Sequence, residues 1–170
     1  MKTSSVFFSV CLAMALLSCM QTPKPDSVQP DLYSIIMDST AKYDAAFAEK
    51  LGSDEFGMCQ YVMAFLKKGP NRSQDSATAA MLQKAHLDNI TRMANTGQLV
   101  VAGPFMDTGA IRGIYIFKVK TVEEAQALTA TDPAIQAGRL TMELHPWYGP
   151  AVLPLITPLF KRLEQKSIAE

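Results

Sequence analysis

The side chains best suited to proton transfer in this sequence are two histidines, His86 and His145. An imidazole has an unperturbed pKa of about 6.5, so it exchanges protons near neutral pH. His86 belongs to an apolar stripe whose members recur every three or four residues, namely Ala79, Leu82, His86, Ile90 and Met93. This spacing alone favours a core histidine satisfied by a hydrogen bond over a general base, and both interpretations stay open. His145 lies beside Glu143 on the polar face of a short alternating segment, which favours a solvated residue over a ligand.

Three further side chains are candidates for ligand binding. Arg112 flanks a hairpin turn, and its planar guanidinium suits a carboxylate or a phenolate; a surface charge is the alternative. Trp147 either stacks on a bound ring or covers the core, and Tyr115 is the third candidate. With two histidines and no clustered cysteines, we expect no metal site, although a single ion held by His86 and carboxylates is left open. No glycine-rich nucleotide fingerprint, P-loop or GxSxG elbow is present, so we also expect no cofactor.

The elements that must position these residues follow from periodicity and from helix and turn signals. Alternating or continuous apolar segments predict strands over 61–66, 99–105, 113–119 and 140–145, the last ended by Pro146. Helical periodicity predicts helices over 38–51, 76–96, with Ser76 as the cap, and 121–130, which starts with a Thr121–Glu124 capping box. After a leading helix, the order strand, helix, strand, strand, helix, strand is the α+β ferredoxin-like pattern. It predicts a four-stranded antiparallel sheet with two helices on one face.

The strand over 113–119 is apolar on both faces, because Tyr115 and Phe117 alternate with Ile114 and Ile116. A sheet covered on one face only would leave the other apolar face in water. We therefore expect a homodimer with two sheets packed face to face, and a C-terminal tail over 154–170 that wraps over the domain or its partner.

The N-terminus predicts export to a bacterial cell envelope. Residues 1–18 have a positive start and an apolar run too short to span a membrane, as in a signal peptide. The segment ending in Leu16-Leu17-Ser18-Cys19 is similar to a lipobox, so Cys19 is the predicted lipidation site. Residues 19–37 contain three prolines among polar residues and are expected to be a tether. The acyl chains would be the only membrane anchor, facing the periplasm or the cell surface.

Length and charge restrict the class of protein. The chain has 170 residues and a mass of 18.6 kDa, which fits one folded domain, predicted over 38–153. Hydrophobic residues make up 48%, which excludes a wholly disordered chain. Sixteen basic and sixteen acidic residues balance, so the basic excess typical of nucleic-acid binding is lacking.

Several short blocks, taken in order, resemble the YCII-related family over about residues 50–153. These blocks are Leu51-Gly52, Gly57-Met58, the run from Tyr61 to Pro70, His86, Ala102-Gly103-Pro104-Phe105, Arg112-Gly113, Glu124-Ala125, Asp132-Pro133 with Gly138, and Pro146-Trp147. The resemblance implies a ferredoxin-like fold paired as a dimeric α+β barrel. Most members of the family are without known function, and one relative is a dehydrochlorinase of a chlorinated hydroxyhydroquinone.

The resemblance also implies a site, a His–Asp pair in a cleft. The matching residues here are His86 and Asp132, with the carboxylate fixing the imidazole as a general base. Turn formation before Pro133 is the alternative role for Asp132. Three functional hypotheses follow: elimination or isomerisation without a cofactor on a small hydroxylated or acidic molecule, capture of a small ligand without turnover, and docking of a protein partner.

Overall fold

A computed structural model describes residues 42–168 of the chain. The predicted signal peptide over 1–18, the lipidation site Cys19 and the tether over 19–37 lie outside the described residues, so these three assignments stay predictions. The chain divides into two units, 1–42 and 43–170, and every described helix and strand belongs to the second. None of the described helices has the length and apolar character needed to cross a membrane.

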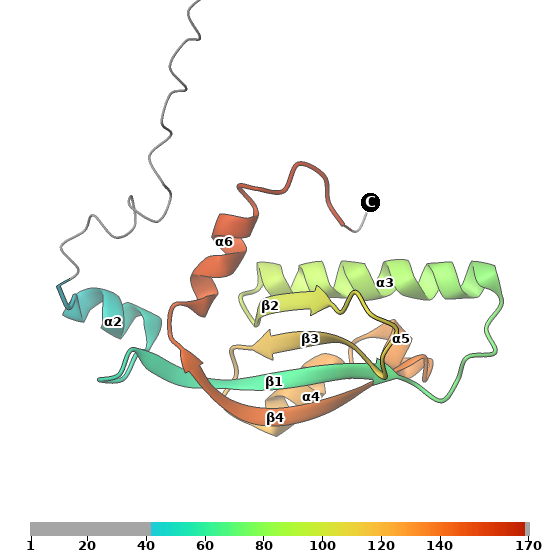
Figure 1. Ribbon diagram of the computed structural model, residues 1–170, viewed down its shortest axis with the longest axis horizontal. Helices are drawn as coiled ribbons and strands as arrows, with labels where there is room; N and C mark the ends of the chain where they lie inside the picture. The colour runs from blue at the N-terminus through green and yellow to red at the C-terminus, as the bar shows by residue number, and fades with distance from the viewer. Residues whose placement is uncertain (1–41, 169–170) are drawn as a thin grey trace, which may run out of the picture. The chain divides into compact units, whose positions relative to one another are not determined.

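The second unit is built around one antiparallel sheet with strand order β2-β3-β1-β4 (Figure 1). This order, reached from a βαββαβ sequence of elements, confirms the predicted ferredoxin-like α+β fold. The elements are α2 (Ala45–Leu51), β1 (Met58–Lys68), α3 (Ser76–Asn95), β2 (Leu99–Pro104), β3 (Ile111–Phe117), α4 (Val122–Thr129), α5 (Pro133–Gln136), β4 (Leu140–Pro150), the 3₁₀ turn η1 (Leu153–Leu155) and α6 (Ile156–Phe160).

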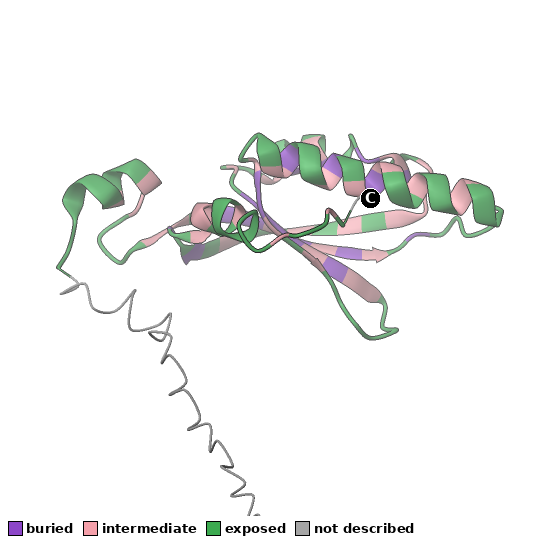
Figure 2. Cartoon of the chain, turned by 90° about the horizontal axis from the view of Figure 1, so that it is seen from above, coloured by how far each residue is buried: buried purple, intermediate pink, exposed green. Residues whose placement is uncertain are grey.

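The main core lies between the sheet and helices α3 and α4. Residues of alternate positions on β1 and β3 supply the sheet side of this core, and Met93 of α3 and Ala125 of α4 supply the helix side. Figure 2 shows the buried residues gathered along the strands and along one stripe of α3. His86 is part of that stripe and is buried together with Met93. The helix periodicity therefore points His86 at the sheet, as predicted.

The opposite face of the sheet carries a smaller apolar cluster. Tyr61, Val100 and Ile116 are buried there, and Trp147 and Leu153 pack against them. Leu153 belongs to η1, which contacts β2 together with α6, so residues beyond the last strand cover part of this side. The two faces of β3 are both apolar, as the alternation in the sequence predicts.

Several predicted element ends are wrong. The leading helix, predicted from residue 38, begins at Ala45, and the first strand, predicted over 61–66, runs from Met58 to Lys68. The last strand does not stop at Pro146 but continues to Pro150, with Pro146 opposite Val62 and Pro150 opposite Met58. Because β4 is an edge strand, it tolerates prolines, whose missing N–H groups can face away from the ladder. The cap of α3 is Asp75 rather than Ser76, since its Oδ1 accepts from the backbone N–H of Thr78 at 2.7 Å. The Thr121–Glu124 capping box is confirmed.

Close approach of β2 to β3 depends on a glycine. A Cβ at Gly113 would lie 2.6 Å from the carbonyl oxygen of Gly103, a backbone atom that cannot rotate away. At Gly103 an added Cβ would meet nothing within 4 Å. The two strands can therefore pair at this point only if position 113 has no side chain.

We predict that Gly113→Ala lowers the free energy of unfolding by about 1–3 kcal/mol, the usual range for overpacking. Urea unfolding followed by circular dichroism measures the change. Gly103→Ala, in the same strand pair, is the matched control and should leave stability the same or slightly higher, because alanine loses less backbone entropy on folding. Equal destabilisation by both substitutions would contradict the steric argument.

Candidate functional site

The buried centre of the site is a hydrogen bond between two side chains that are far apart in the sequence. Nδ1 of His86 lies 2.5 Å from Oδ2 of Asp132. His86 is 6% exposed and Asp132 is 0% exposed. A buried carboxylate requires donors, so Nδ1 carries the proton that faces it and Nε2 is left as the basic nitrogen. The two residues that the family resemblance implies as a His–Asp pair thus lie in contact.

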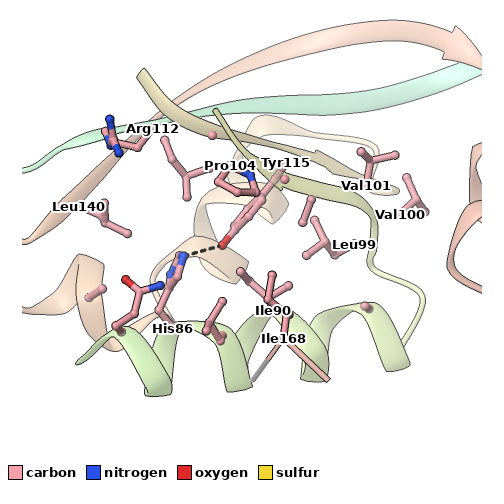
Figure 3. Close-up of a pocket in the computed structure, with 18 of the residues that line it drawn as sticks. His86, Ile90, Leu99, Val100, Val101, Pro104, Arg112, Tyr115, Leu140 and Ile168 are labelled. Carbon is pink, nitrogen blue, oxygen red and sulfur yellow. Dashed lines mark hydrogen bonds between the residues drawn. The ribbon is translucent and has the colours of Figure 1, made fainter. Parts of the chain in front are cut away.

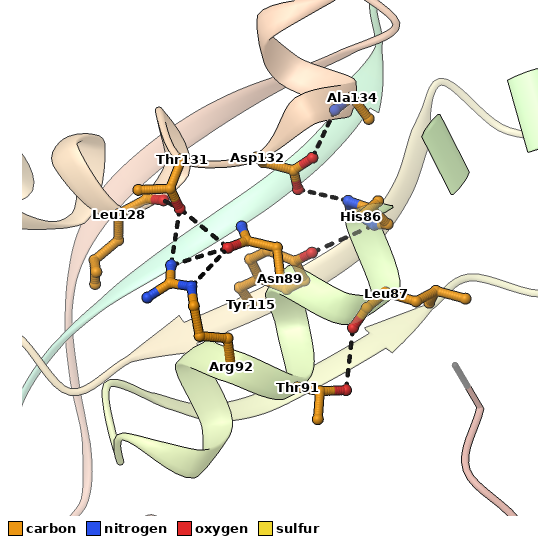
Figure 4. Close-up of polar contacts among 10 residues, drawn as sticks. All are labelled: His86, Leu87, Asn89, Thr91, Arg92, Tyr115, Leu128, Thr131, Asp132 and Ala134. Atoms are coloured by element: carbon orange, nitrogen blue, oxygen red, sulfur yellow. Dashed lines mark hydrogen bonds and ion pairs between the residues drawn. The ribbon is translucent and has the colours of Figure 1, made fainter. Parts of the chain in front are cut away.

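The local sequence explains how Asp132 is held. Its second oxygen, Oδ1, accepts from the backbone N–H of Ala134 at 2.8 Å, which makes Asp132 the N-cap of α5 (Figure 4). Pro133 takes the first helical position, where a missing N–H costs nothing. The cap fixes the carboxylate, and its other oxygen turns toward α3. The turn role and the pairing role of Asp132 are therefore filled by the same side chain.

A second set of polar contacts fixes the residue before Asp132 to α3. The Arg92 guanidinium donates to Oδ1 of Asn89 at 2.9 and 3.1 Å and to the Thr131 hydroxyl at 2.9 Å (Figure 4). The Thr131 hydroxyl in turn lies 2.7 Å from the carbonyl oxygen of Leu128. Because these contacts join one turn of α3 to the end of α4, they restrict movement of the Asp132 carboxylate relative to His86.

His86 opens onto a cavity of about 580 Å³ between α3, β2 and the segment after β4 (Figure 3). The hydroxyl of Tyr115 lies 3.4 Å from Nε2 of His86, so both groups face the same space. Burial, and secondly the negative charge of Asp132, raise the pKa of Tyr115 above its ordinary value. Tyr115 therefore stays a neutral phenol, able to donate a hydrogen bond.

The charged side chains that line the cavity all have the same sign. Lys68, Arg72, Arg112 and Arg139 are among its lining residues, and no aspartate or glutamate of the described chain is. Arg112, a candidate ligand-binding residue, therefore lines the cavity. The other three were not selected from the sequence, since they lie in different loops and strand ends and have no common motif.

Residues beyond the last strand form part of the cavity wall. Ile156, Thr157, Phe160 and Ile168 all line it. The sequence indicated only that the tail wraps over the domain or its partner, and no periodic signal in this short segment indicates which part it covers.

Two other candidates lie elsewhere. Trp147 is on the opposite face of the sheet, with its ring 5.8 Å from that of Tyr61, and does not line the cavity. His145 is exposed and contacts Glu143 at 2.9 Å. Contacts with Lys67, and secondly with His145, lower the pKa of Glu143. Within residues 42–168, no group of three or more histidine, cysteine, aspartate or glutamate side chains is arranged to hold a metal ion.

The family is decided by the sequence of the domain that contains this pair. Residues 60–147 match the YCII-related domain, and this matched range makes up more than half of the chain. The chain belongs to the YCII-related family. The matched region includes His86, Asp132, Tyr115 and Arg112, whereas the YCII-related domain ends before Ile156 and Phe160 of the cavity wall.

Solved structures include chains similar to this one. The YCII-related chain is similar to the 5-chloro-2-hydroxyhydroquinone dehydrochlorinase of Burkholderia phenoliruptrix AC1100, in complex with 2,5-dihydroxybenzoquinone. The two share 17% identity with a TM-score of 0.39, over 51% of this chain and 92% of that one. No curated protein matches the chain.

We predict that Asp132→Asn lowers the free energy of unfolding by about 1.5–3 kcal/mol, because the His86 N–H loses a charged acceptor in a buried place. Chemical denaturation measures the change. Asp88→Asn is the matched control: Asp88 forms an exposed pair with Lys84, and such pairs contribute at most about 1 kcal/mol. Equal effects of the two substitutions would show that the buried hydrogen bond adds nothing special to stability.

Proposed function

We propose that this protein catalyses proton transfer to and from carbon in a small hydroxylated or acidic organic molecule, leading to elimination or isomerisation. The observation that carries the proposal is the 2.5 Å contact between His86 Nδ1 and Asp132 at the wall of a cavity of about 580 Å³. A cavity of this size suits a small organic ligand. An imidazole oriented by a carboxylate is the arrangement that general-base catalysis requires.

The reaction step uses only groups of this chain. Nε2 of His86 takes a proton from a C–H bond of the substrate, and Nδ1–H stays hydrogen-bonded to Asp132, whose negative charge stabilises the imidazolium formed. The electron pair of the broken C–H bond either moves into a neighbouring carbonyl to give an enolate or expels a leaving group as its anion. In isomerisation the proton returns from Nε2 to another carbon; in elimination it passes to solvent. Neither route changes the oxidation balance, so no oxidant or reductant is consumed.

Tyr115 has a distinct part in this scheme. Its phenol stays protonated, because burial raises its pKa. The hydroxyl lies 3.4 Å from Nε2 of His86, so an oxygen of a substrate whose C–H bond faces the imidazole would lie within reach of the phenol. A donor placed where negative charge develops stabilises the enolate more than the ground state.

The proposal is tested with β-chlorinated keto acids and with enolisable hydroxy and keto acids in deuterated buffer. Proton NMR follows the loss of carbon-bound hydrogen, and an ion electrode follows chloride release. We predict turnover of at least one compound by the wild-type protein and a decrease of about 10²- to 10⁴-fold in His86→Gln, the usual contribution of general-base catalysis.

The matched control is His145→Gln, which removes the exposed histidine and should leave the rate unchanged. Circular dichroism establishes that both variants fold. Equal rates in wild type and His86→Gln would remove the assigned base, and binding of compounds with no exchange and no chloride release would favour a ligand-binding protein instead.

The face of the sheet opposite α3 and α4 supports a second proposal, a homodimer paired through this face. Phe65 and Ile114 are opposite each other on β1 and β3 and are only half-buried, next to the buried Ile116. Apolar side chains gathered on a sheet face that is only partly covered are typical of an interface. The dimer would explain why β3 is apolar on both faces.

Sedimentation velocity tests this pairing. We predict that the wild-type protein sediments as a dimer and that Phe65→Glu shifts it to a monomer, because a carboxylate would be buried without a partner. Phe56→Glu is the control, since Phe56 is 75% exposed outside the sheet. A monomeric wild-type protein would overturn the proposal.

A further inference from the structure

The cavity is electrostatically asymmetric, with its cations at one end of the sheet. Lys68, Arg112 and Arg139 lie at the same end of the strands. In the sheet register, Lys68 is opposite Leu140, the residue after Arg139. Gly113, the residue after Arg112, is opposite both Leu66 and Pro104. Arg72 joins them, because its guanidinium donates to the carbonyl oxygen of Arg139 at 3.2 Å. Four positive side chains therefore lie around one end of the cavity.

No carboxylate of the described chain forms an ion pair with these four side chains. Arg112 donates to the carbonyl oxygen of Asp107 at 3.0 Å, Arg139 to the side-chain oxygen of Gln74 at 3.1 Å, and Lys68 to the carbonyl oxygen of Thr108 at 3.4 Å. All of these acceptors are neutral, and none of the four cations forms a salt bridge within the described residues. An anion at this end would gain charge-assisted hydrogen bonds that no group of the described chain supplies.

The other end of the cavity is apolar. Val100, at the start of β2, and Ile156 and Phe160, in α6, line it there. The Lys161 ammonium donates to the side-chain oxygen of Asn95 at 2.6 Å, which ties α6 to the last turn of α3. Figure 3 shows His86 and Tyr115 between the two ends, with Arg112 and Leu140 on one side and Val100 and Val101 on the other.

From this asymmetry we propose that the substrate is an amphipathic organic anion, a molecule with one acidic group and an apolar body. The acidic group binds at the Arg112–Arg139 end, and the apolar body extends toward Val100 and Phe160. This inference rests on the proposed function, because it places the reacting C–H bond at His86, between the acidic group and the apolar body. Part of the apolar end comes from α6, which lies outside the family domain, so this preference belongs to this chain rather than to the domain.

Two fluorescent probes that differ in one group test the charge preference. 1-Anilinonaphthalene-8-sulfonate carries an anion, and 1-anilinonaphthalene has the same ring system without it. We expect the full-length protein to bind the sulfonate about tenfold more tightly, as the loss of one charge-assisted hydrogen bond predicts. Sodium chloride should weaken binding of the sulfonate only, because salt screens charges.

Single substitutions locate both ends of the bound probe. Arg139→Gln and Arg112→Gln should each weaken binding of the sulfonate about tenfold and leave binding of the neutral probe unchanged. Arg162→Gln, which lies outside the cavity, is the charge-matched control. Phe160→Ala should weaken both probes, whereas Leu159→Ala, exposed and outside the cavity, should weaken neither. Arg112→Lys retains the charge and should keep the preference, which separates loss of charge from damage to the hairpin turn.

The outcomes distinguish this inference from the proposed reaction. Equal affinity for the two probes, or an unchanged preference in both Arg112→Gln and Arg139→Gln, overturns the amphipathic anion. An effect of Leu159→Ala equal to that of Phe160→Ala overturns the apolar end. Probe binding and deuterium exchange are separate measurements, so a failure of the deuterium-exchange assay alone removes the reaction but leaves the ligand class in place.

Discussion

The structure depends on one buried interaction, the hydrogen bond from His86 Nδ1 to the Asp132 carboxylate. Asp132 has no exposed surface, and a carboxylate in that position is tolerated only when its oxygens have donors. One donor is the imidazole of α3 and the other is the backbone N–H of Ala134 in α5. This requirement links the middle of a long helix to the start of a short one. It also leaves the second imidazole nitrogen directed at the cavity, 3.4 Å from the Tyr115 hydroxyl.

The surroundings of this pair favour chemistry over a merely structural role. A histidine satisfied in a closed core needs no space beside its second nitrogen, yet His86 and Tyr115 both line a cavity of about 580 Å³. The Arg92–Asn89–Thr131 contacts fix the residue before Asp132 to α3, on the side of the pair away from the cavity. The pair is therefore held in place by the protein while His86 still faces the cavity. Positioned bases are effective because little motion is needed to reach the reacting geometry.

The cavity combines parts of different origin. The His–Asp pair and all four cations belong to the YCII-related domain, but Ile156 and Phe160 come from the segment after it. The proposed base and the proposed apolar subsite therefore belong to different stretches of chain. A conserved fold commonly hosts different specificities in this way, because segments outside the central sheet can change without disturbing the buried centre.

The sequence by itself determined the βαββαβ order, the faces of β3, the capping box of α4 and the place of His86 on the buried stripe of α3. These features are local, since they follow from periodicities of two and 3.6 residues and from caps within one turn. Pairing with Asp132 was suggested by resemblance to a family and not by spacing, because 46 residues separate the two side chains. Tertiary structure alone decided four other features. These are the extension of β4 past Pro146, the position of Trp147 on the far face of the sheet, the gathering of four cations, and the part of the cavity wall that α6 forms. Each depends on which strand is at the edge and which segments meet in space, and no local pattern encodes that.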